Sequence, residues 1–487
     1  MSFKSQVFDV RTINMNGTTE QIVKGGRDLL HLLPDALKGI SQIGVIGWGS
    51  QGPAQAQNLR DSLEGTDIKV VVGLRNGSSS FAKARKAGFY KKDGTAGEMF
   101  DVIKSSDLVI LLISDAAQTD LYPEIFKALK PGATLGLSHG FLLGHMNNVG
   151  DNFPENHNVV MVAPKGMGDS VRKLYVQGET TNGAGINASF AVQQDVDGRA
   201  TDIALAWSLG IGSPYTFETT MEMEFKSDIF GERAILLGGV WGIVEGLFGR
   251  FKVAKGLDIA FQDAVESLTG PINSMISDNG LFAVFEALDI SDRDTFATYY
   301  SAAYNASMPI IAEIYDEVAS GNEIRGVNLA GARLDKYPMT KVDGTQMWQI
   351  GERVRAARTE NSNKRIDPMT AGVYIGVMMA QIDLLIDKGH SWSEIANESV
   401  IEATDSLNPY MHARGIAYMV DGCSRTARLG AYRWGPRFRT ALESRAFVDI
   451  DNGKVEMGIF NNFGNHPIHE ALRICGELRP SVKISLT

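Results

Sequence analysis

The stretch GVIGWGSQGPAQAQNL, residues 44–59, indicates the architecture of the first part of this chain. It leaves a short apolar segment, passes three glycines in a G-x-G-x-x-G spacing and continues from Pro53 into a helix expected to end near Leu63. The glycines are Gly47, Gly49 and Gly52. They permit a tight turn and let a pyrophosphate approach the helix N-terminus, where free N–H groups favour an anion. The pattern therefore predicts a dinucleotide-binding unit rather than a plain tight turn.

Apolar segments that alternate with helical or polar stretches surround this loop. Each is rich in leucine or β-branched residues, as expected for strands buried on both faces. The segments are IGVI (43–46), IKVVVG (68–73), LVILLI (108–113), ATLGLS (133–138) and VVMVA (159–163). This spacing predicts an α/β, Rossmann-type, doubly wound parallel sheet over residues 1–215.

Beyond residue 215 the chain changes to long helices that are rich in small residues and buried on much of their circumference. The clearest are 227–251, 298–320 and 369–389. The charged segment 352–366 is the best candidate for a linker, so this all-α C-terminal region is divided into 216–362 and 363–487.

These two helical parts share features that suggest copies of one unit. Asp228 and Asp367 each precede a glycine-interrupted helix, and the pair Glu266-Ser267 resembles Glu398-Ser399. The intervals between matched features differ, so duplication and coincidence both stay open.

Composition excludes several classes of protein. The 487 residues carry a formal charge of −10 without basic runs, which argues against nucleic acid as a partner. Cys423 and Cys475 form neither a disulfide framework nor a zinc motif. No 18 consecutive apolar residues occur, so no membrane-spanning helix is expected. The N-terminus resembles neither a signal nor a transit peptide, and we expect a cytoplasmic bacterial protein, or an organelle stroma or matrix protein if a presequence was removed.

The residues after the second strand indicate which cofactor binds. An NAD site usually has an acid here, yet none follows before Asp93; Arg75 stands before Ser78, Ser79 and Ser80 instead. A guanidinium with hydroxyl donors suits a 2′-phosphate, so we expect NADPH rather than a merely polar turn. The full predicted cofactor set is Gly47, Gly49, Ser50, Gln51, Gly52, Arg75, Ser78, Ser80, Ser114 and Gly166.

Two series of carboxylates repeat every four residues in the helical region. The first is Glu224, Asp228 and Glu232, and the second is Glu394, Glu398 and Glu402. Residues four apart share one helix face, where like charges repel and are costly to bury, so a cation is expected against each face. Ser391 and Glu394 form a capping box, which gives Glu394 a structural role. A solvated acidic face is the alternative for either series considered alone.

The type of donor limits the metal. Carboxylate oxygens without Cys or His at motif spacing suit Mg²⁺ or Mn²⁺ rather than zinc. Four carboxylates exceed the needs of one hydrated Mg²⁺, so two ions sharing a ligand are expected.

Over nearly its whole length the chain resembles the ketol-acid reductoisomerase family, in particular its long, plant-like class with a duplicated helical domain. The motifs that carry the resemblance are GVIGWGSQGPAQAQNL, LGLSHGF (135–141), APKGMG (163–168), KSDIFGE (226–232), NESVIEA (397–403) and CSRTARLG (423–430). It implies rearrangement and NADPH reduction of acetohydroxy acids, a knotted helical region, and a homodimer or homotetramer.

The resemblance also implies roles for individual residues. The metal ligands would be Asp228, Glu232, Glu398 and Glu402, with Asp228 as the bridge. Ser424 would contact the substrate carboxylate, and Glu398 would also face the substrate. Lys165 would belong to the metal–water network and His139 would lie near the nicotinamide, while Glu224 would lie just outside the ligands. The catalytic set is thus His139, Lys165, Glu232 and Glu402.

Two other functions remain open at this point. A β-hydroxyacid or 6-phosphogluconate type dehydrogenase also joins a Rossmann domain to helices but needs no divalent metal. A non-catalytic NADPH-sensing protein would leave the acidic faces unexplained.

Overall fold

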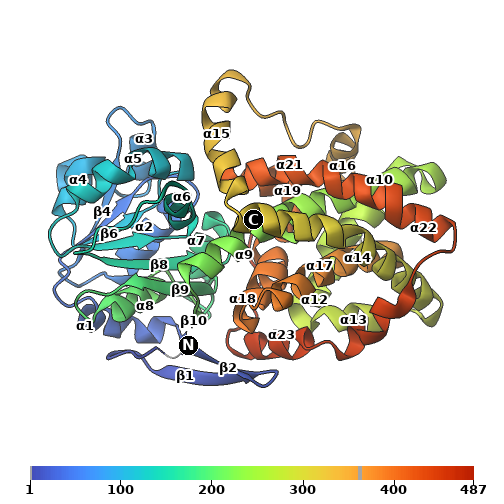
Figure 1. Ribbon diagram of the computed structural model, residues 1–487, viewed down its shortest axis with the longest axis horizontal. Helices are drawn as coiled ribbons and strands as arrows, with labels where there is room; N and C mark the ends of the chain where they lie inside the picture. Colours follow the sequence, from blue (N-terminus) through green and yellow to red (C-terminus); the bar gives the residue numbers. More distant parts are fainter. Residues whose placement is uncertain (1–2, 360–364, 487) are drawn as a thin grey trace. The chain divides into compact units, whose positions relative to one another are not determined.

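The computed structural model describes residues 3–359 and 365–486 (Figure 1). The chain divides into two compact units. The α/β unit holds residues up to 225 with 323–331 and 476–485, and the helical unit holds 226–322 and 332–475. The predicted boundary at 362 lies outside the described residues, so the three-part division stays a prediction.

The predicted doubly wound sheet is confirmed in the α/β unit. Six neighbouring strands run parallel in the order β5-β4-β3-β6-β7-β8. Their bounds are β3 Gln42–Ile46, β4 Lys69–Leu74, β5 Ala96–Glu98, β6 Leu108–Leu111, β7 Thr134–Leu137 and β8 Asn158–Pro164. The strand order reverses beside β3, and ligands of doubly wound folds bind at such a reversal.

Five strands were missed from the sequence, because the short parallel strand β5 was not predicted either. The other four make the sheet mixed. They are β1 Val10–Met15, β2 Thr18–Lys24, β9 Ala188–Gln194 and β10 Tyr215–Glu218. Strand β9 runs antiparallel to β8, and the hairpin of β1 and β2 pairs with β10. The first two strands are largely polar, and β1 lies at the edge of the sheet. Their signal was the Asn16-Gly17 turn, in which both residues have positive φ, as favoured in tight hairpins.

Alternate residues of the central strands face two helical layers. Leu108 and Ile110 pack in one core with helices α2 Gly52–Ser62 and α8 Ala200–Gly210. Val109 and Leu111 pack in the other core with α4 Met99–Ser105, α5 Asp115–Ala128 and α6 Phe141–Val149. Burial on both faces explains why these strands are continuous apolar runs.

The helical unit is built on long apolar helices that pack at small residues. The principal ones are α9 Met221–Arg233, which begins in the α/β unit, α10 Val240–Lys255, α14 Ile290–Ala319, α17 Pro368–Asp387 and α21 Arg425–Ala441. Two stretches, Met221–Lys255 and Pro368–Asp387, are long and apolar enough to cross a bilayer, but 83% of each apolar window is buried inside the protein. Such burial is typical of core helices.

The predicted linker over 352–366 is wrong in its first part. Residues 352–356 belong to helix α16 Gln346–Ala356, whose apolar face, with Trp348, Ile350 and Val354, is buried. Residues 360–364 lie outside the described part of the chain.

The helical unit contains a repeat with a constant register. Successive pairs of elements start 135 positions apart, at residues 257 and 392, 262 and 397, 268 and 403, and 273 and 408. The pairs are α11 Leu257–Phe261 with α18 Trp392–Ala396, the π-helical turns Gln262–Glu266 and Leu268–Ile272 with Asn397–Ile401 and Ala403–Leu407, and α12 Asn273–Asn279 with α19 Asn408–Arg414. Each copy then passes a glycine of positive φ, Gly280 or Gly415.

This register supports duplication and corrects the residue match made from the sequence. It pairs Glu398 with Asp263 and Glu402 with Ser267, whereas the sequence had suggested Glu266-Ser267 as the counterpart of Glu398-Ser399. The sequence did not show this register because equivalent positions in the two copies carry different side chains. The knot stays a prediction.

Close packing of α14 against α17 gives a test of this architecture. A Cβ on Gly376 would lie 2.4 Å from the Tyr300 carbonyl oxygen, so Gly376→Ala must separate the two backbones. We expect a loss of about 1–3 kcal/mol in the free energy of unfolding, measured by denaturant titration. Gly249→Ala, in helix α10, meets only the Glu443 side chain at 3.5 Å and serves as the control. Equal stability of the two variants would contradict the packing.

Candidate functional site

The glycine loop leaves no room for side chains. Gly47 has φ +113°, and a Cβ there would lie 2.5 Å from the Leu112 carbonyl oxygen. A Cβ on Gly52 would lie 2.5 Å from the Gly47 carbonyl oxygen. Helix α2 begins at Gly52, so its free N–H groups face a cradle of bare backbone suited to a pyrophosphate.

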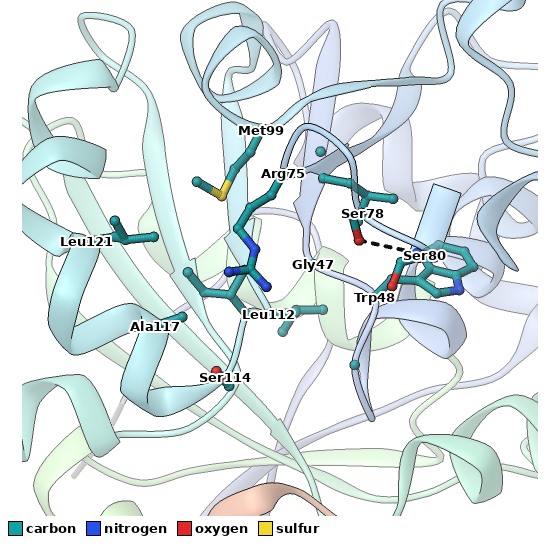
Figure 2. Close-up of a pocket in the computed structure, with 14 residues that line it drawn as sticks. Gly47, Trp48, Arg75, Ser78, Ser80, Met99, Leu112, Ser114, Ala117 and Leu121 are labelled. Atoms are coloured by element: carbon teal, nitrogen blue, oxygen red, sulfur yellow. Dashed lines mark hydrogen bonds between the residues drawn. The ribbon is translucent and has the colours of Figure 1, made fainter. Parts of the chain in front are cut away.

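A pocket opens beside this loop, at the reversal of strand order (Figure 2). Six predicted cofactor residues line it, namely Gly47, Gly49, Arg75, Ser78, Ser80 and Ser114. Figure 2 shows the Arg75 side chain reaching into the pocket between Met99 and Ser114. The Ser80 backbone N–H donates to the Ser78 hydroxyl at 3.2 Å, which fixes the serine turn. The Arg75 side chain and both serines thus line one pocket, where the sequence placed the 2′-phosphate site.

Apolar lining residues of the pocket were missed from the sequence. They are Trp48, Leu74, Met99, Leu112, Ile113, Ala117 and Leu121. They come from five separate segments, so no local pattern marks them as neighbours. An apolar wall with few polar groups is typical of small-molecule sites and suits a flat ring such as adenine.

The other predicted cofactor residues lie in the adjoining loops. The Gln51 side-chain amide donates to the Gly166 carbonyl oxygen at 2.9 Å, joining the glycine loop to the end of β8. A Cβ on Gly168 would lie 1.9 Å from the Ser50 carbonyl oxygen, so these loops touch through backbone. Ser50, Gln51, Gly52 and Gly166 therefore shape the glycine loop without lining the pocket itself.

His139 lies at the end of β7 and pairs with Asp115, the first residue of α5. The distance from His139 Nε2 to Asp115 Oδ1 is 3.1 Å, and the Asp115 carboxylate is buried. The Phe141 backbone N–H donates to His139 Nδ1 at 3.3 Å, so Nε2 carries the proton given to Asp115. Asp115 was not predicted, although it directly follows the pocket residue Ser114.

Lys165 and Glu224 form a buried ion pair in the same unit. Lys165 Nζ lies 3.3 Å from Glu224 Oε1, and both side chains are almost wholly inaccessible to solvent. Glu224 Oε2 also accepts the Gly140 backbone N–H at 2.7 Å, so this carboxylate ties the loop after His139 to the end of β8. The cation expected against the first acidic series is, at Glu224, the ammonium of Lys165.

In the helical unit, one carboxylate of each series meets the other. Asp228 and Glu398 can each place an oxygen within 4.8 Å of the other, and Glu398 is fully buried. Asp228 stands one turn after Glu224 on α9, while Glu398 lies in the π-helical turn Asn397–Ile401. Widened turns of this kind are rare in proteins, but those that occur often lie at functional sites.

The remaining predicted ligands gather around Cys423. Burial and then the negative charges of Glu232, Glu402 and Asp228 raise the pKa of its thiol well above the ordinary value. All three carboxylates therefore lie close enough for their charges to act on one sulfur atom. The next residue, Ser424, is the N-cap of α21, and its hydroxyl accepts the Ala427 backbone N–H at 3.0 Å.

The serine half of the capping box predicted at Glu394 is present, while the Glu394 carboxylate contacts other groups. The Ser391 hydroxyl accepts the Glu394 backbone N–H at 3.3 Å, as in a capping box. The Glu394 carboxylate accepts the hydroxyl of Ser227 at 2.9 Å and lies 3.1 Å from His390 Nδ1. Because Ser227 precedes Asp228 and Glu394 stands one turn before Glu398, this bond links the two carboxylate-bearing helices beside the close pair.

The donor set around Asp228 and Glu398 fits a hard divalent cation. Its members are oxygens held in apolar helices, and two of them already approach within the span of one ion's coordination sphere. Burying such charges without a cation would be costly. The site could therefore hold Mg²⁺ or Mn²⁺ and polarise substrate oxygens.

Comparisons with known proteins place the chain in a family. Residues 36–216 match the description "Acetohydroxy acid isomeroreductase, NADPH-binding domain". Residues 221–360 and 369–461 match "Ketol-acid reductoisomerase, C-terminal domain".

Individual relatives agree with this assignment. The chain is 56% identical over 495 residues to the chloroplastic ketol-acid reductoisomerase of Spinacia oleracea, covering 100% of this chain and 83% of that protein. It is 34% identical over 360 residues to ketol-acid reductoisomerase (NAD(+)) of Desulfosudis oleivorans, covering 73% of this chain and 99% of that protein. A solved NADH-preferring ketol-acid reductoisomerase from an uncultured archaeon aligns with a TM-score of 0.54 at 25% identity, covering 68% of this chain and 97% of that one.

With an NADPH-binding domain and a reductoisomerase C-terminal domain matched along most of its length, the chain is an NADP-dependent oxidoreductase that belongs to the ketol-acid reductoisomerase family of branched-chain amino-acid synthesis.

Proposed function

We propose that this protein rearranges and reduces 2-acetolactate and 2-aceto-2-hydroxybutyrate to 2,3-dihydroxy-3-methyl acids, with NADPH and two Mg²⁺ ions, in valine, isoleucine and leucine synthesis. The observation that carries the proposal is the close approach of the half-buried Asp228 to the buried Glu398 in a chain of this family. An alkyl migration requires an alkoxide and a polarised carbonyl on adjacent carbons. Clustered carboxylates supply a place for the cations that such a step needs.

The four predicted ligands have distinct duties. Asp228, Glu232, Glu398 and Glu402 would hold the cations, which when bound hold both reacting oxygens and lower the pKa of the tertiary hydroxyl. Asp228 would be shared by the ions because carboxylates of both acidic series lie close to it. Ser424 and Glu398 would orient the substrate, Ser424 from a backbone position fixed by its cap on α21.

The buried side chains of the α/β unit would hold His139 in a fixed position. The Lys165–Glu224 pair and the Gly140 N–H bond hold the loop that carries His139. Asp115 in turn accepts the Nε2–H of His139 and so fixes the orientation of its ring. Glu402, Glu232 and a water held by Lys165 are the candidates for the group that removes the hydroxyl proton.

Arg75 and the serine turn favour NADPH over NADH. NADPH supplies the hydride that reduces the rearranged ketone. Its 2′-phosphate would be bound by the guanidinium of Arg75 with the hydroxyls of Ser78 and Ser80, all of which line the pocket.

Assembly and location are proposals drawn from the resemblance and the relatives. We expect a homodimer or homotetramer, without nucleic acid or membrane as a partner. The spinach and pea relatives are named as chloroplastic, which favours a plastid over a bacterial cytoplasm for this protein.

Removal of the metal with EDTA distinguishes this function from the two alternative functions. With 2-acetolactate and Mg²⁺ the protein should oxidise NADPH, and EDTA should abolish the rate until Mg²⁺ is restored, followed by absorbance at the nicotinamide band. A metal-independent hydroxyacid dehydrogenase would keep its rate with EDTA. An NADPH sensor would bind the cofactor without turnover in either condition.

Glu398→Gln should remove the metal-dependent reaction while leaving NADPH binding intact. Loss of one charged ligand should lower kcat at least about 100-fold, equivalent to about 3 kcal/mol of transition-state stabilisation. Asp263→Asn, at the equivalent position of the other copy, is the matched control and should retain activity. The assignment is wrong if Glu398→Gln stays active, or if both variants lose activity equally.

Arg75→Ala should weaken NADPH far more than NADH. Charge-assisted hydrogen bonds contribute about 1.5–3 kcal/mol, so the dissociation constant of NADPH should rise about 10–150-fold, measured by nucleotide fluorescence titration. Arg85→Ala, in the following helix α3 Ser80–Lys86 and outside the pocket lining, should change neither constant. Equal weakening of both nucleotides by Arg75→Ala would exclude the 2′-phosphate assignment.

A further inference from the structure

One charged side chain of the helical unit is buried beside the proposed ligands and was not predicted to have a role. Arg233, the last residue of α9, has no solvent-exposed surface although arginine is almost never fully buried without a partner. A buried guanidinium is costly unless its charge and its N–H groups are satisfied. Its partners therefore indicate what this position is for.

The guanidinium of Arg233 joins two parts of the proposed site. Nη1 donates to Glu232 Oε2 at 2.8 Å, and Nη2 donates to the Thr426 carbonyl oxygen at 3.2 Å. Glu232 is a proposed metal ligand, and Thr426 lies in the first turn of α21, two residues after Ser424. One rigid group thus contacts both a ligand carboxylate and the helix start that presents the substrate serine.

The surroundings of Arg233 are shaped to hold the guanidinium in this place. A Cβ on Gly430, one turn further along α21, would lie 2.8 Å from Arg233 Cζ and 2.9 Å from Nε. The position of α21 that faces the guanidinium, Gly430, therefore needs a residue without a side chain. A Cβ on Gly238 would lie 2.2 Å from the Arg233 carbonyl oxygen, so the backbone of Arg233 is closely packed as well.

We propose that Arg233 is a positioning residue that sets the orientation of Glu232 relative to Ser424 for cation binding, an inference that rests on the proposed function. The planar guanidinium directs its two N–H bonds along fixed lines, which a lysine ammonium cannot do. Its permanent charge also reduces the repulsion between Glu232 and the neighbouring carboxylates. Arg233 acts through Glu232 and α21, without itself binding the cation.

The test measures Mn²⁺ binding to the NADPH-loaded protein by isothermal titration and by the electron paramagnetic resonance signal of free Mn²⁺. Groups that orient metal ligands typically contribute about 10–100-fold to metal affinity. Arg233→Met should raise the dissociation constant for Mn²⁺ by that factor and raise the Mg²⁺ concentration for half-maximal activity in parallel. NADPH affinity should stay unchanged. Arg233→Lys should restore part of the loss because it restores the charge.

Two further variants keep the test decisive. Gly430→Ala retains Arg233 but displaces its guanidinium, and it should weaken Mn²⁺ about tenfold even if Arg233→Met does not fold. Arg358→Met removes another arginine–glutamate pair, with the buried Glu266 at 2.5 Å and away from the proposed ligands in sequence, and it should lower stability without changing Mn²⁺ affinity.

Glu232→Gln separates failure of this inference from failure of the proposed function. If Glu232→Gln weakens Mn²⁺ while Arg233→Met and Gly430→Ala bind it as the unmodified protein does, Arg233 has no positioning role. If Glu232→Gln also binds Mn²⁺ normally, Glu232 is not a ligand and the proposed metal site is wrong.

Discussion

The cost of holding several carboxylates in an apolar environment constrains much of this structure. Each acid of the first series must be balanced, and the protein does so differently along a single helix. Lys165 pairs with Glu224, Arg233 pairs with Glu232, and between them Asp228 approaches Glu398. Lysine and arginine side chains thus pair with the first and third acids of this helix. Such an arrangement keeps the ligands charged and ordered, which a site for hard cations requires.

Close approach of backbones is the second constraint, and glycine makes it possible in both units. In the α/β unit, Gly47 and Gly52 bring bare peptide groups to the pyrophosphate cradle. In the helical unit, Gly376 brings α17 against α14, and Gly430 makes room for Arg233. At each position a Cβ would meet a neighbouring atom at 2.8 Å or less, so even alanine would require displacement.

The repeat in the helical unit shows how a duplicated fold carries one site. At the position equivalent to Glu398 stands Asp263, and the Lys255 ammonium lies 2.6 Å from its carboxylate and 3.2 Å from that of Asp367. Ser267 replaces Glu402 and accepts the Asp367 backbone N–H at 2.8 Å. One copy thus satisfies its acids with an internal ion pair, while the other presents a close pair of carboxylates. The two copies share backbone geometry and differ in charge.

Local patterns in the sequence were sufficient to predict the dinucleotide loop, five of the six neighbouring parallel strands, the Arg75 turn and the two acidic series. Each depends on periodicity or on a short motif, and such features act between residues near in the chain. Only the tertiary structure decided which acids meet, that Arg233 and Asp115 contact site residues, which apolar side chains line the pocket, and in which register the helical copies match. These depend on contacts between residues far apart in sequence, where pairing is set by packing and charge balance rather than by any local pattern. The edge hairpin lay between these cases, since its Asn16-Gly17 turn was visible but its polar strands acquire their place only by pairing with β10.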